Sequence, residues 1–244
     1  MTKPDHPTEA LVLAGGLGTR LRSAVPDLPK PLAPVGGRPF LEHLLSHWRR
    51  RGIDRFVLSV GYKADLISDH FGTGYLGAAI DYVREEEPLG TGGALALAFR
   101  RIAFRGRRIL LLNGDTWFPA DLEGLLAAAD PERPVNLVLV RVEANDRYGG
   151  VELDGRGGVV RFGLPAEGKP ALINAGCYLL NCAKVAAGLA GFPERFSLEA
   201  DWLAPLAESG KVGGIIQEAD FIDIGVPDDY RRFCRDYGAQ LSTT

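Results

Sequence analysis

Residues 11–31 read LVLAGGLGTRLRSAVPDLPKP and contain the strongest structural signal in the chain. The apolar run at 11–14 predicts a buried strand, and Gly15, Gly16 and Gly18 follow it directly. Glycines spaced so closely let the backbone turn sharply and leave no Cβ between the main chain and a ligand. Successive N–H groups in such a turn can converge on an anion. The segment therefore predicts a strand followed by a phosphate-binding loop.

Two basic residues on the same segment supply the positive charge that phosphate binding needs. Arg20 offers a planar donor suited to phosphate oxygens. Lys30 lies between Pro29 and Pro31, whose fixed φ angles stiffen the backbone on both sides. No glycine precedes Lys-Ser or Lys-Thr, which excludes a Walker A loop, and Leu21 stands where the dinucleotide fingerprint needs its third glycine. We therefore predict that the loop binds a nucleoside triphosphate.

The composition is typical of a soluble globular protein and narrows the choice of partners. The 244 residues are enough for one large α/β domain, with 24% charged and 46% hydrophobic residues. A net charge of −3 argues against nucleic-acid or membrane-surface binding, and no apolar run is long enough to span a membrane. The first residues lack the apolar segment of a secretory signal, and the three cysteines lack metal-ligand spacing. We therefore expect reduced thiols and a cytoplasmic location.

Alternating apolar runs and amphipathic stretches predict an α/β fold. Residues 11–14, 56–60 and 109–112 are expected to form buried parallel strands. A helix over 39–51, with Pro39 at its first position, is expected between the first two strands. Ligands of such sheets bind at the carboxyl ends of the strands, so we expect the site there.

The second half of the chain is richer in strand-like sequence, which predicts an antiparallel extension of the sheet. We also expect Thr91 to cap a helix over 92–101, whose N-terminus would favour an anion. A C-terminal helix is expected to begin at Pro227 and to end at Gly238. The strand-like runs are residues 135–142, 150–153, 159–162 and 175–180.

Two carboxylates stand where apolar strands are expected to end. Asp115 follows the run at 109–112, and Asp223 lies between Ile222 and Ile224, where an unpartnered carboxylate would be costly. A strand-end turn and a structural salt bridge are the competing explanations for these two residues. Mg²⁺ needs only one or two protein carboxylates in addition to phosphate oxygens. We predict that the two aspartates hold Mg²⁺.

These motifs resemble those of the sugar-phosphate nucleotidylyltransferases, which join a nucleoside triphosphate to a sugar 1-phosphate and release pyrophosphate. GGLGTRL followed by PKP resembles the family signature, and the likeness extends in order over nearly the whole chain. The further motifs are PLGTGGA at 88–94 on the base side, LNGD at 112–115 and FIDIG at 221–225 at the metal, and YG at 148–149, INAG at 173–176 and FSLE at 196–199 on the sugar side.

The resemblance implies a Rossmann-like, mixed and mostly parallel sheet flanked by helices, with a small β-rich sugar-binding extension. It implies one domain over 1–244, in which residues 9–135 bind the nucleotide, 136–225 bind the sugar and 226–240 form the C-terminal helix. It also implies Mg²⁺ as the cofactor, held by Asp115 and Asp223. Arg20 is expected on the β and γ phosphates and Lys30 on the α phosphate, and these four residues are the expected catalytic set.

The same resemblance, together with the local patterns, assigns residues to the two substrates. The family often has Phe-x-Glu-Lys ahead of INAG, whereas here a glycine separates Glu167 from Lys169 in the stretch 162–170. We expect these two residues to serve the sugar side. The expected nucleotide-binding residues are Leu13, Ala14, Gly15, Gly16, Gly18, Thr19, Arg20, Lys30, Glu87, Gly90, Thr91, Asn113 and Gly114, and the expected sugar-binding residues are Gly149, Glu167, Lys169, Asn174 and Glu199.

The words GRPFLEHLL, LSVGYKADLI and EPLGTGGAL resemble those of family members that use guanosine triphosphate (GTP) and a manno-configured heptose 1-phosphate. Mannose 1-phosphate, or another sugar 1-phosphate with a uridine or thymidine triphosphate, stays open as an alternative. A glycosyltransferase would usually show Asp-x-Asp near Asp115, where this chain has Asn113. A regulatory paralogue that senses a nucleotide sugar would be expected to lose one of the four catalytic residues. A homodimer stays open as the assembly.

Overall fold

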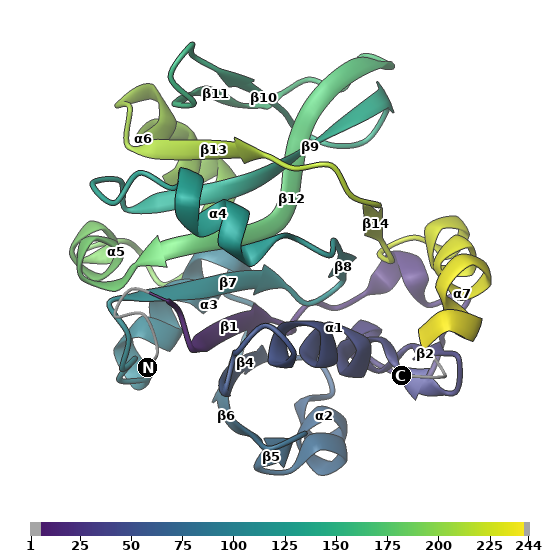
Figure 1. The fold of residues 1–244 in the computed structure, drawn as a ribbon. Coiled ribbons are helices and arrows are strands. Elements are labelled where there is room, and N and C mark those ends of the chain that lie inside the picture. Colours follow the sequence, from purple (N-terminus) through teal and green to yellow (C-terminus); the bar gives the residue numbers. More distant parts are fainter. Residues whose placement is uncertain (1–5, 242–244) are drawn as a thin grey trace.

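The computed structural model describes residues 6–241, and a ten-stranded sheet forms their centre (Figure 1). Its main path has the order β11-β10-β12-β7-β1-β4-β6-β5, and β9 pairs with both β12 and β13. The strands are β1 (Glu9–Leu13), β4 (Arg55–Val60), β5 (Gly74–Tyr75), β6 (Ala78–Arg84), β7 (Arg108–Asn113), β9 (Val135–Asn145), β10 (Gly150–Leu153), β11 (Val159–Leu164), β12 (Lys169–Asn181) and β13 (Val212–Ile216).

Four parallel strands, in the order β7-β1-β4-β6, form the middle of the sheet. Successive side chains on a strand point to opposite faces, so Ala10 and Val12 pack into one hydrophobic core and Leu11 into the other. Strands covered on both faces need continuous apolar runs, which is what the sequence has. The predicted parallel strands at 11–14, 56–60 and 109–112 are confirmed, with bounds shifted by one or two residues.

Helices cover both faces of this central sheet, as predicted for the α/β class. The expected helix at 39–51 begins one residue late, at Phe40, because Pro39 belongs to the short strand β3 (Arg38–Pro39). One face carries α1 (Phe40–Arg49), α2 (Ala64–Phe71) and α4 (Leu122–Ala128), and the other carries α3 (Gly90–Arg101), α5 (Cys182–Leu189), the π-helix Leu198–Leu203 and α6 (Ala204–Glu208).

An antiparallel extension, formed by β9 to β12 and drawn at the top of Figure 1, joins the four parallel strands where β12 pairs with β7, and it confirms the prediction for the second half. The register between β9 and β12 shifts between Asn174 and Tyr178. Gly176 lies in this bulge with φ 72°, and a Cβ there would approach Asn113 Nδ2 to 2.9 Å. Glycine therefore lets β12 pass closely over the end of β7, which brings the extension against the parallel part of the sheet.

A third buried cluster joins the two ends of the chain. The paired strands β8 (Thr116–Trp117) and β14 (Ile222–Asp223) contribute to it, as does helix α7 (Pro227–Leu241). Helix α7 begins at Pro227 as predicted, but it continues through Gly238, so the predicted stop is wrong. A helical glycine costs only about 1 kcal/mol, and Gly238 packs against the backbone of Gly36.

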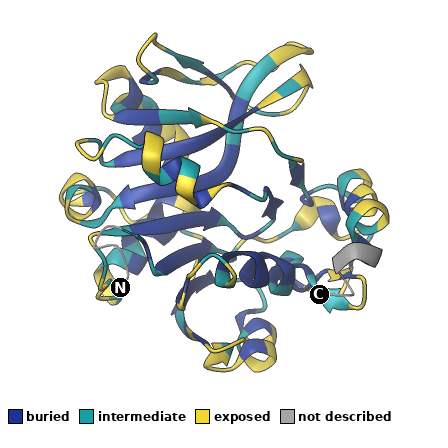
Figure 2. Cartoon of the chain, viewed as in Figure 1, coloured by how far each residue is buried: buried dark blue, intermediate teal, exposed yellow. Residues whose placement is uncertain are grey.

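Figure 2 shows buried residues along the strands and exposed residues on hairpins and on the outer faces of helices. Within residues 6–241, no helix has the length and apolar character needed to cross a lipid bilayer. The fold therefore leaves polar side chains in the loops at the ends of the buried strands.

Candidate active site

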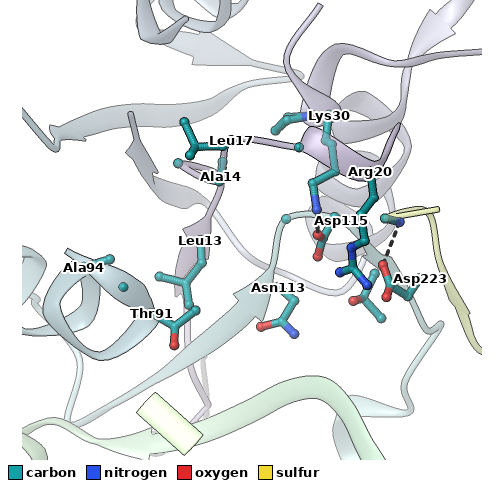
Figure 3. Close-up of a pocket in the computed structure, with 18 of the residues that line it drawn as sticks. Leu13, Ala14, Leu17, Arg20, Lys30, Thr91, Ala94, Asn113, Asp115 and Asp223 are labelled. Carbon is teal, nitrogen blue, oxygen red and sulfur yellow. Dashed lines mark hydrogen bonds and ion pairs between the residues drawn. The ribbon is translucent and has the colours of Figure 1, made fainter. Parts of the chain in front are cut away.

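A cavity of about 590 Å³ opens at the carboxyl ends of β1 and β7, where most of the predicted site residues meet (Figure 3). The catalytic set lines it, and so do most residues expected at the nucleotide and sugar. The predicted residues that line the cavity are Leu13, Ala14, Gly15, Gly16, Gly18, Thr19, Arg20, Lys30, Gly90, Thr91, Asn113, Gly114, Asp115, Gly149, Asn174, Glu199 and Asp223.

Two of the three glycines in the loop after β1 stand where a Cβ would meet a neighbouring side chain. Gly18 has φ 61°, and a Cβ on it would lie 2.8 Å from Lys30 Cγ. A Cβ on Gly15 would lie 2.4 Å from Glu85 Oε1. Gly16 has open space around its Cα, since no heavy atom lies within 4 Å of a Cβ built there. The loop is therefore held at Gly15 and Gly18 and presents its backbone to the cavity between them.

Lys30 and Asp115 form a partly buried ion pair on one wall of the cavity. Lys30 begins a short 3₁₀ turn directly after Pro29. Its Nζ lies 2.5 Å from Asp115 Oδ2, and the two side chains are only 14% and 30% exposed. Such a pair is screened little by water, so Lys30 holds a strong local positive charge beside the carboxylate.

The two predicted metal ligands come together through the β8–β14 ladder. Asp223 pairs with Thr116, the residue after Asp115, and the Ile224 N–H donates to the Asp115 carbonyl at 2.9 Å. Burial and the neighbouring Asp115 carboxylate raise the pKa of Asp223, while a hydrogen bond from the Gly225 N–H opposes the shift. Two carboxylates in one partly buried place favour a shared cation.

The donor set fits Mg²⁺ bound together with substrate phosphates. No group of three or more His, Cys, Asp and Glu side chains arranged for a metal occurs within residues 6–241. Asp115 and Asp223 supply the one or two carboxylates that Mg²⁺ takes from proteins at phosphate sites. Arg20 is exposed in the turn Thr19–Leu21, and Figure 3 shows its side chain pointing into the same part of the cavity as Asp223.

Glu85, and not the predicted Glu87, lies in the cavity on the side of helix α3. Strand β6 ends at Arg84, so Glu85 is the first residue of the loop. Its carboxylate accepts hydrogen bonds from the Leu89 N–H at 3.1 Å and from Ser59 Oγ at 3.3 Å. Burial raises the pKa of Glu85 above its ordinary value. Glu87 is exposed and does not line the cavity, so the structure does not bring it to the predicted position.

The start of α3 differs from its prediction. Its N-cap residue is Leu89, so the prediction of Thr91 as the cap is wrong by two residues. Thr91 Oγ1 instead accepts a hydrogen bond from the Leu198 N–H at 3.0 Å. The Gly92 and Gly93 N–H groups donate to the Phe196 carbonyl, at 3.1 and 3.4 Å. These two donors of the first turn are therefore engaged by the 194–198 segment, which they help to hold.

Asn174 and Glu199, two of the residues predicted to bind the sugar, form a polar wall of the cavity. Asn174 Nδ2 donates to Glu199 Oε1 at 2.9 Å and also to the Tyr178 hydroxyl, while its Oδ1 accepts from the Gly176 N–H at 3.0 Å. The bulge in β12 and the π-helix thus position one amide and one carboxylate together. Gly149 lies opposite β11, where a Cβ would approach Gly163 Cα to 2.9 Å.

Glu167 and Lys169 lie outside this cavity, at the turn between β11 and β12 and at the start of β12. They form an exposed ion pair with each other at 2.8 Å. Both line a separate depression of about 550 Å³ on the extension. Gly168, with φ 68°, turns the chain between them and keeps them on the hairpin. The structure therefore does not bring these two predicted residues to the other sugar-side groups.

Two aromatic residues complete the cavity and were not among the predicted site residues. Tyr148 and Phe221 line it, with ring centroids 5.2 Å apart in an edge-to-face arrangement at 84°. Both belong to motifs quoted from the sequence, Tyr148 to YG at 148–149 and Phe221 to FIDIG at 221–225. Their place in these motifs was the available signal, because a loop that carries a functional residue also carries its neighbours into the site.

The chain belongs to the nucleotidyl transferase family, whose sequence model matches residues 9–240. It is 41% identical over 229 residues to a D-glycero-α-D-manno-heptose 1-phosphate guanylyltransferase of Aneurinibacillus thermoaerophilus, covering 92% of this chain and 96% of that protein. The enzyme of the same name from Campylobacter jejuni is 39% identical, with 92% and 98% covered. The crystal structure of HddC from Yersinia pseudotuberculosis superposes with a TM-score of 0.82 at 33% identity, covering 94% of this chain and 99% of HddC.

Proposed function

We propose that this protein is a Mg²⁺-dependent guanylyltransferase that transfers GMP from GTP to D-glycero-α-D-manno-heptose 1-phosphate, releasing pyrophosphate. The observation that carries the proposal is the meeting of Asp115, Asp223 and Lys30 beside a glycine loop at one end of the cavity. The similarity to guanylyltransferases over more than nine-tenths of the chain supports the choice of substrates. HddC has also been crystallised in complex with GMP-PN.

The reaction needs positioning and charge neutralisation more than proton transfer. An oxygen of the sugar phosphate attacks the α-phosphorus of GTP, and the bond to the pyrophosphate oxygen breaks in line. A phosphate monoester has a second pKa of about 6, so the nucleophile is already anionic near neutrality. Lys30 faces the α phosphate and the incoming sugar phosphate, where its compact charge offsets their repulsion. Arg20 binds the leaving β and γ phosphates.

Asp115 and Asp223 would hold Mg²⁺, which neutralises phosphate charge when it is bound. The two aspartates approach from β7 and β14, elements packed rigidly in separate cores. The backbone of the glycine loop orients the triphosphate without side-chain obstruction. The folded protein therefore already holds in place the groups that offset the repulsion between the two anionic substrates.

The base and the sugar are selected at opposite sides of the cavity. Guanine presents N1–H and N2–H₂ donors on one edge, and Glu85 supplies a carboxylate acceptor beside the glycine loop. The Asn174–Glu199 pair offers both an amide donor and carboxylate acceptors to sugar hydroxyls. Tyr148 and Phe221 provide an apolar face against which a sugar ring can pack.

Pyrophosphate release across a matrix of triphosphates and sugar 1-phosphates tests the proposal. We expect the highest kcat/KM with GTP and the heptose 1-phosphate. Mannose 1-phosphate should react about tenfold less well, because it lacks one hydroxymethyl group and its hydrogen bond is worth about 1 kcal/mol. A preference for uridine or thymidine triphosphate, or for a gluco-configured hexose 1-phosphate, would refute the assignment of substrates.

A further inference from the structure

Arg147 takes no part in the proposed reaction, yet it contacts two acids at the edge of the candidate metal site. Its Nη2 donates to Asp223 Oδ2 at 3.2 Å, and its Nη1 lies 2.8 Å from Asp229 Oδ2. Its guanidinium also donates to the Tyr148 hydroxyl and lies over that ring, 4.6 Å from the centroid. One side chain therefore joins the loop between β9 and β10, strand β14 and the first turn of α7.

The ion pairs of Arg147 with Asp223 and Asp229 are partly buried. The side chains of Arg147, Asp223 and Asp229 are 28%, 17% and 25% exposed. Ion pairs in such places are screened less by water and salt than fully exposed ones. Lys30 balances Asp115 on one side of the carboxylate pair, and Arg147 balances Asp223 on the other. The charge on each predicted metal ligand is thus already matched by a protein cation.

Arg147 also has a second acidic partner, Asp229, which remains if it leaves Asp223. Its guanidinium contacts Asp223 and Asp229 at the same time. Asp229 lies in the first turn of α7, where the helix dipole stabilises a negative charge. If a divalent cation takes Asp223, Arg147 keeps a partner and the loop that carries Tyr148 and Gly149 stays anchored.

We propose that Arg147 is a positioning residue that a divalent cation displaces from Asp223, while its pair with Asp229 holds the Tyr148–Gly149 loop at the sugar side of the cavity. The inference rests on the proposed function in taking Asp115 and Asp223 as metal ligands. It predicts that Arg147 and the metal compete for Asp223. A salt bridge that does not involve a metal ligand would produce no such competition.

Mn²⁺ binding to the nucleotide-free protein, followed by the electron paramagnetic resonance of free Mn²⁺, tests the competition. Arg147→Met should tighten the Kd for Mn²⁺ about threefold, because the competing cation is gone. Asp229→Asn should weaken it about threefold, because Asp223 is then the one acid of the pair that still attracts Arg147. Asp228→Asn is the matched control on the same helical turn, since Asp228 is exposed and pairs with Arg231, and should leave the Kd within about twofold.

Steady-state kinetics test the anchoring of the loop. Arg147→Met should raise the KM for the sugar 1-phosphate about tenfold and leave the KM for GTP within about twofold, because the loop that loses its contact with α7 lies at the proposed sugar side and keeps its bonds to the Asn145 side chain. Arg147→Lys should fall between, since a lysine holds one of the two acids at a time. Asp229→Asn, which keeps Arg147, carries the test if Arg147→Met does not fold.

The outcomes separate this inference from the proposed function. Opposite shifts of the Mn²⁺ Kd in Arg147→Met and Asp229→Asn support it, even if GTP is not the substrate. Shifts in the same direction, an unchanged Kd in Arg147→Met, or no Mn²⁺ binding by the unsubstituted protein at millimolar concentration would overturn it. Failure of GTP in the substrate matrix, with the Kd shifts as expected, overturns only the choice of substrates.

Discussion

Two lysine–carboxylate pairs in this protein have similar geometry and very different surroundings. Lys30 and Asp115 lie 2.5 Å apart with 14% and 30% of their side chains exposed, whereas Lys169 and Glu167 lie 2.8 Å apart with 75% and 60% exposed. The first pair stands on loops that leave buried strands, and the second stands on an exposed hairpin. Exposed pairs contribute about 0–1 kcal/mol, whereas sheltered charges act strongly on a ligand.

The same contrast extends to the two ends of the cavity. The end proposed to bind the phosphates, here called the phosphate end, is formed by short loops at the ends of β1 and β7, which are fixed by two hydrophobic cores. The end proposed to bind the sugar, here called the sugar end, depends on a bulge in β12, a π-helix and a loop between antiparallel strands. Under the proposed function, the charged groups of the reaction are held by the core, and substrate selection depends on segments whose positions follow from local turns.

The largest effect should follow loss of either predicted metal ligand at the phosphate end. Asp115→Asn and Asp223→Asn should each lower kcat by about 10³-fold, because a neutral amide gives Mg²⁺ no charge to bind. Pyrophosphate release measures the loss, and thermal unfolding checks that the fold survives. Turnover near that of the unsubstituted protein in both variants, or full activity in excess chelator, would break the assignment of this end to the metal.

Loss of the sheltered lysine should come next. Lys30→Met should lower kcat/KM about 100-fold, or about 2.7 kcal/mol, since under the proposed function its charge faces a phosphate whose geometry changes in the transition state. Lys30→Arg should recover little, because a planar fork does not replace a compact ammonium. Lys184→Met, at a surface pair with Glu132, is the control. A change within twofold for Lys30→Met would remove the distinction between the two lysine pairs.

The phosphate end could be predicted in detail because its residues are tied to strand ends. Apolar runs locate the strands, and parallel strands bring their carboxyl ends to one edge, so Gly15, Asn113 and Asp115 could be expected to meet. Glu87 was chosen because it precedes the motif at 88–94, whereas the structure places Glu85 in the cavity, since three successive glutamates gave no local signal for where β6 ends.

The sugar end was predictable only in outline. Antiparallel strands could be expected from alternating residues and turns. The position of the β11–β12 turn depends on Gly163 and Gly168, both with positive φ, and on the register of β12, none of which a sequence pattern specifies. Glu167 and Lys169 were therefore assigned by motif to a place that the hairpin does not reach.

Gly93→Ala tests the contact between helix α3 and the segment that leads to Glu199, which joins the two ends of the cavity. A Cβ at Gly93 would lie 2.2 Å from the Glu194 carbonyl oxygen, so either α3 or the segment leading to Glu199 must move. We expect a loss of about 1–3 kcal/mol in the free energy of unfolding, measured with urea, and a higher KM for the sugar 1-phosphate. Gly155→Ala, with open space at its Cβ, should change stability by less than about 0.5 kcal/mol. Equal stability of the two variants would show that this contact yields easily.

Glu85→Gln tests the proposed role of Glu85 in selecting the base at the phosphate end of the cavity. Replacing a carboxylate acceptor by an amide should lower kcat/KM for GTP about tenfold, or about 1.4 kcal/mol, with a smaller loss for uridine triphosphate. Competition kinetics with the two triphosphates measure the difference. Glu87→Gln is the matched control two residues away, since Glu87 does not line the cavity, and should stay within about twofold. A larger loss in Glu87→Gln would restore the assignment made from sequence.

The smallest effect should follow loss of the exposed pair, and this sharpens the comparison most. Glu167→Gln and Lys169→Met should change the KM for the sugar 1-phosphate by less than about twofold, because an exposed pair outside the cavity contributes little to binding. Glu199→Gln, at the polar wall of the cavity, should raise the same KM about tenfold. A tenfold rise in Lys169→Met would mean that the β11–β12 hairpin closes over the sugar phosphate in the complex, so that the exposed pair becomes sheltered and the contrast with Lys30–Asp115 holds only for the free protein.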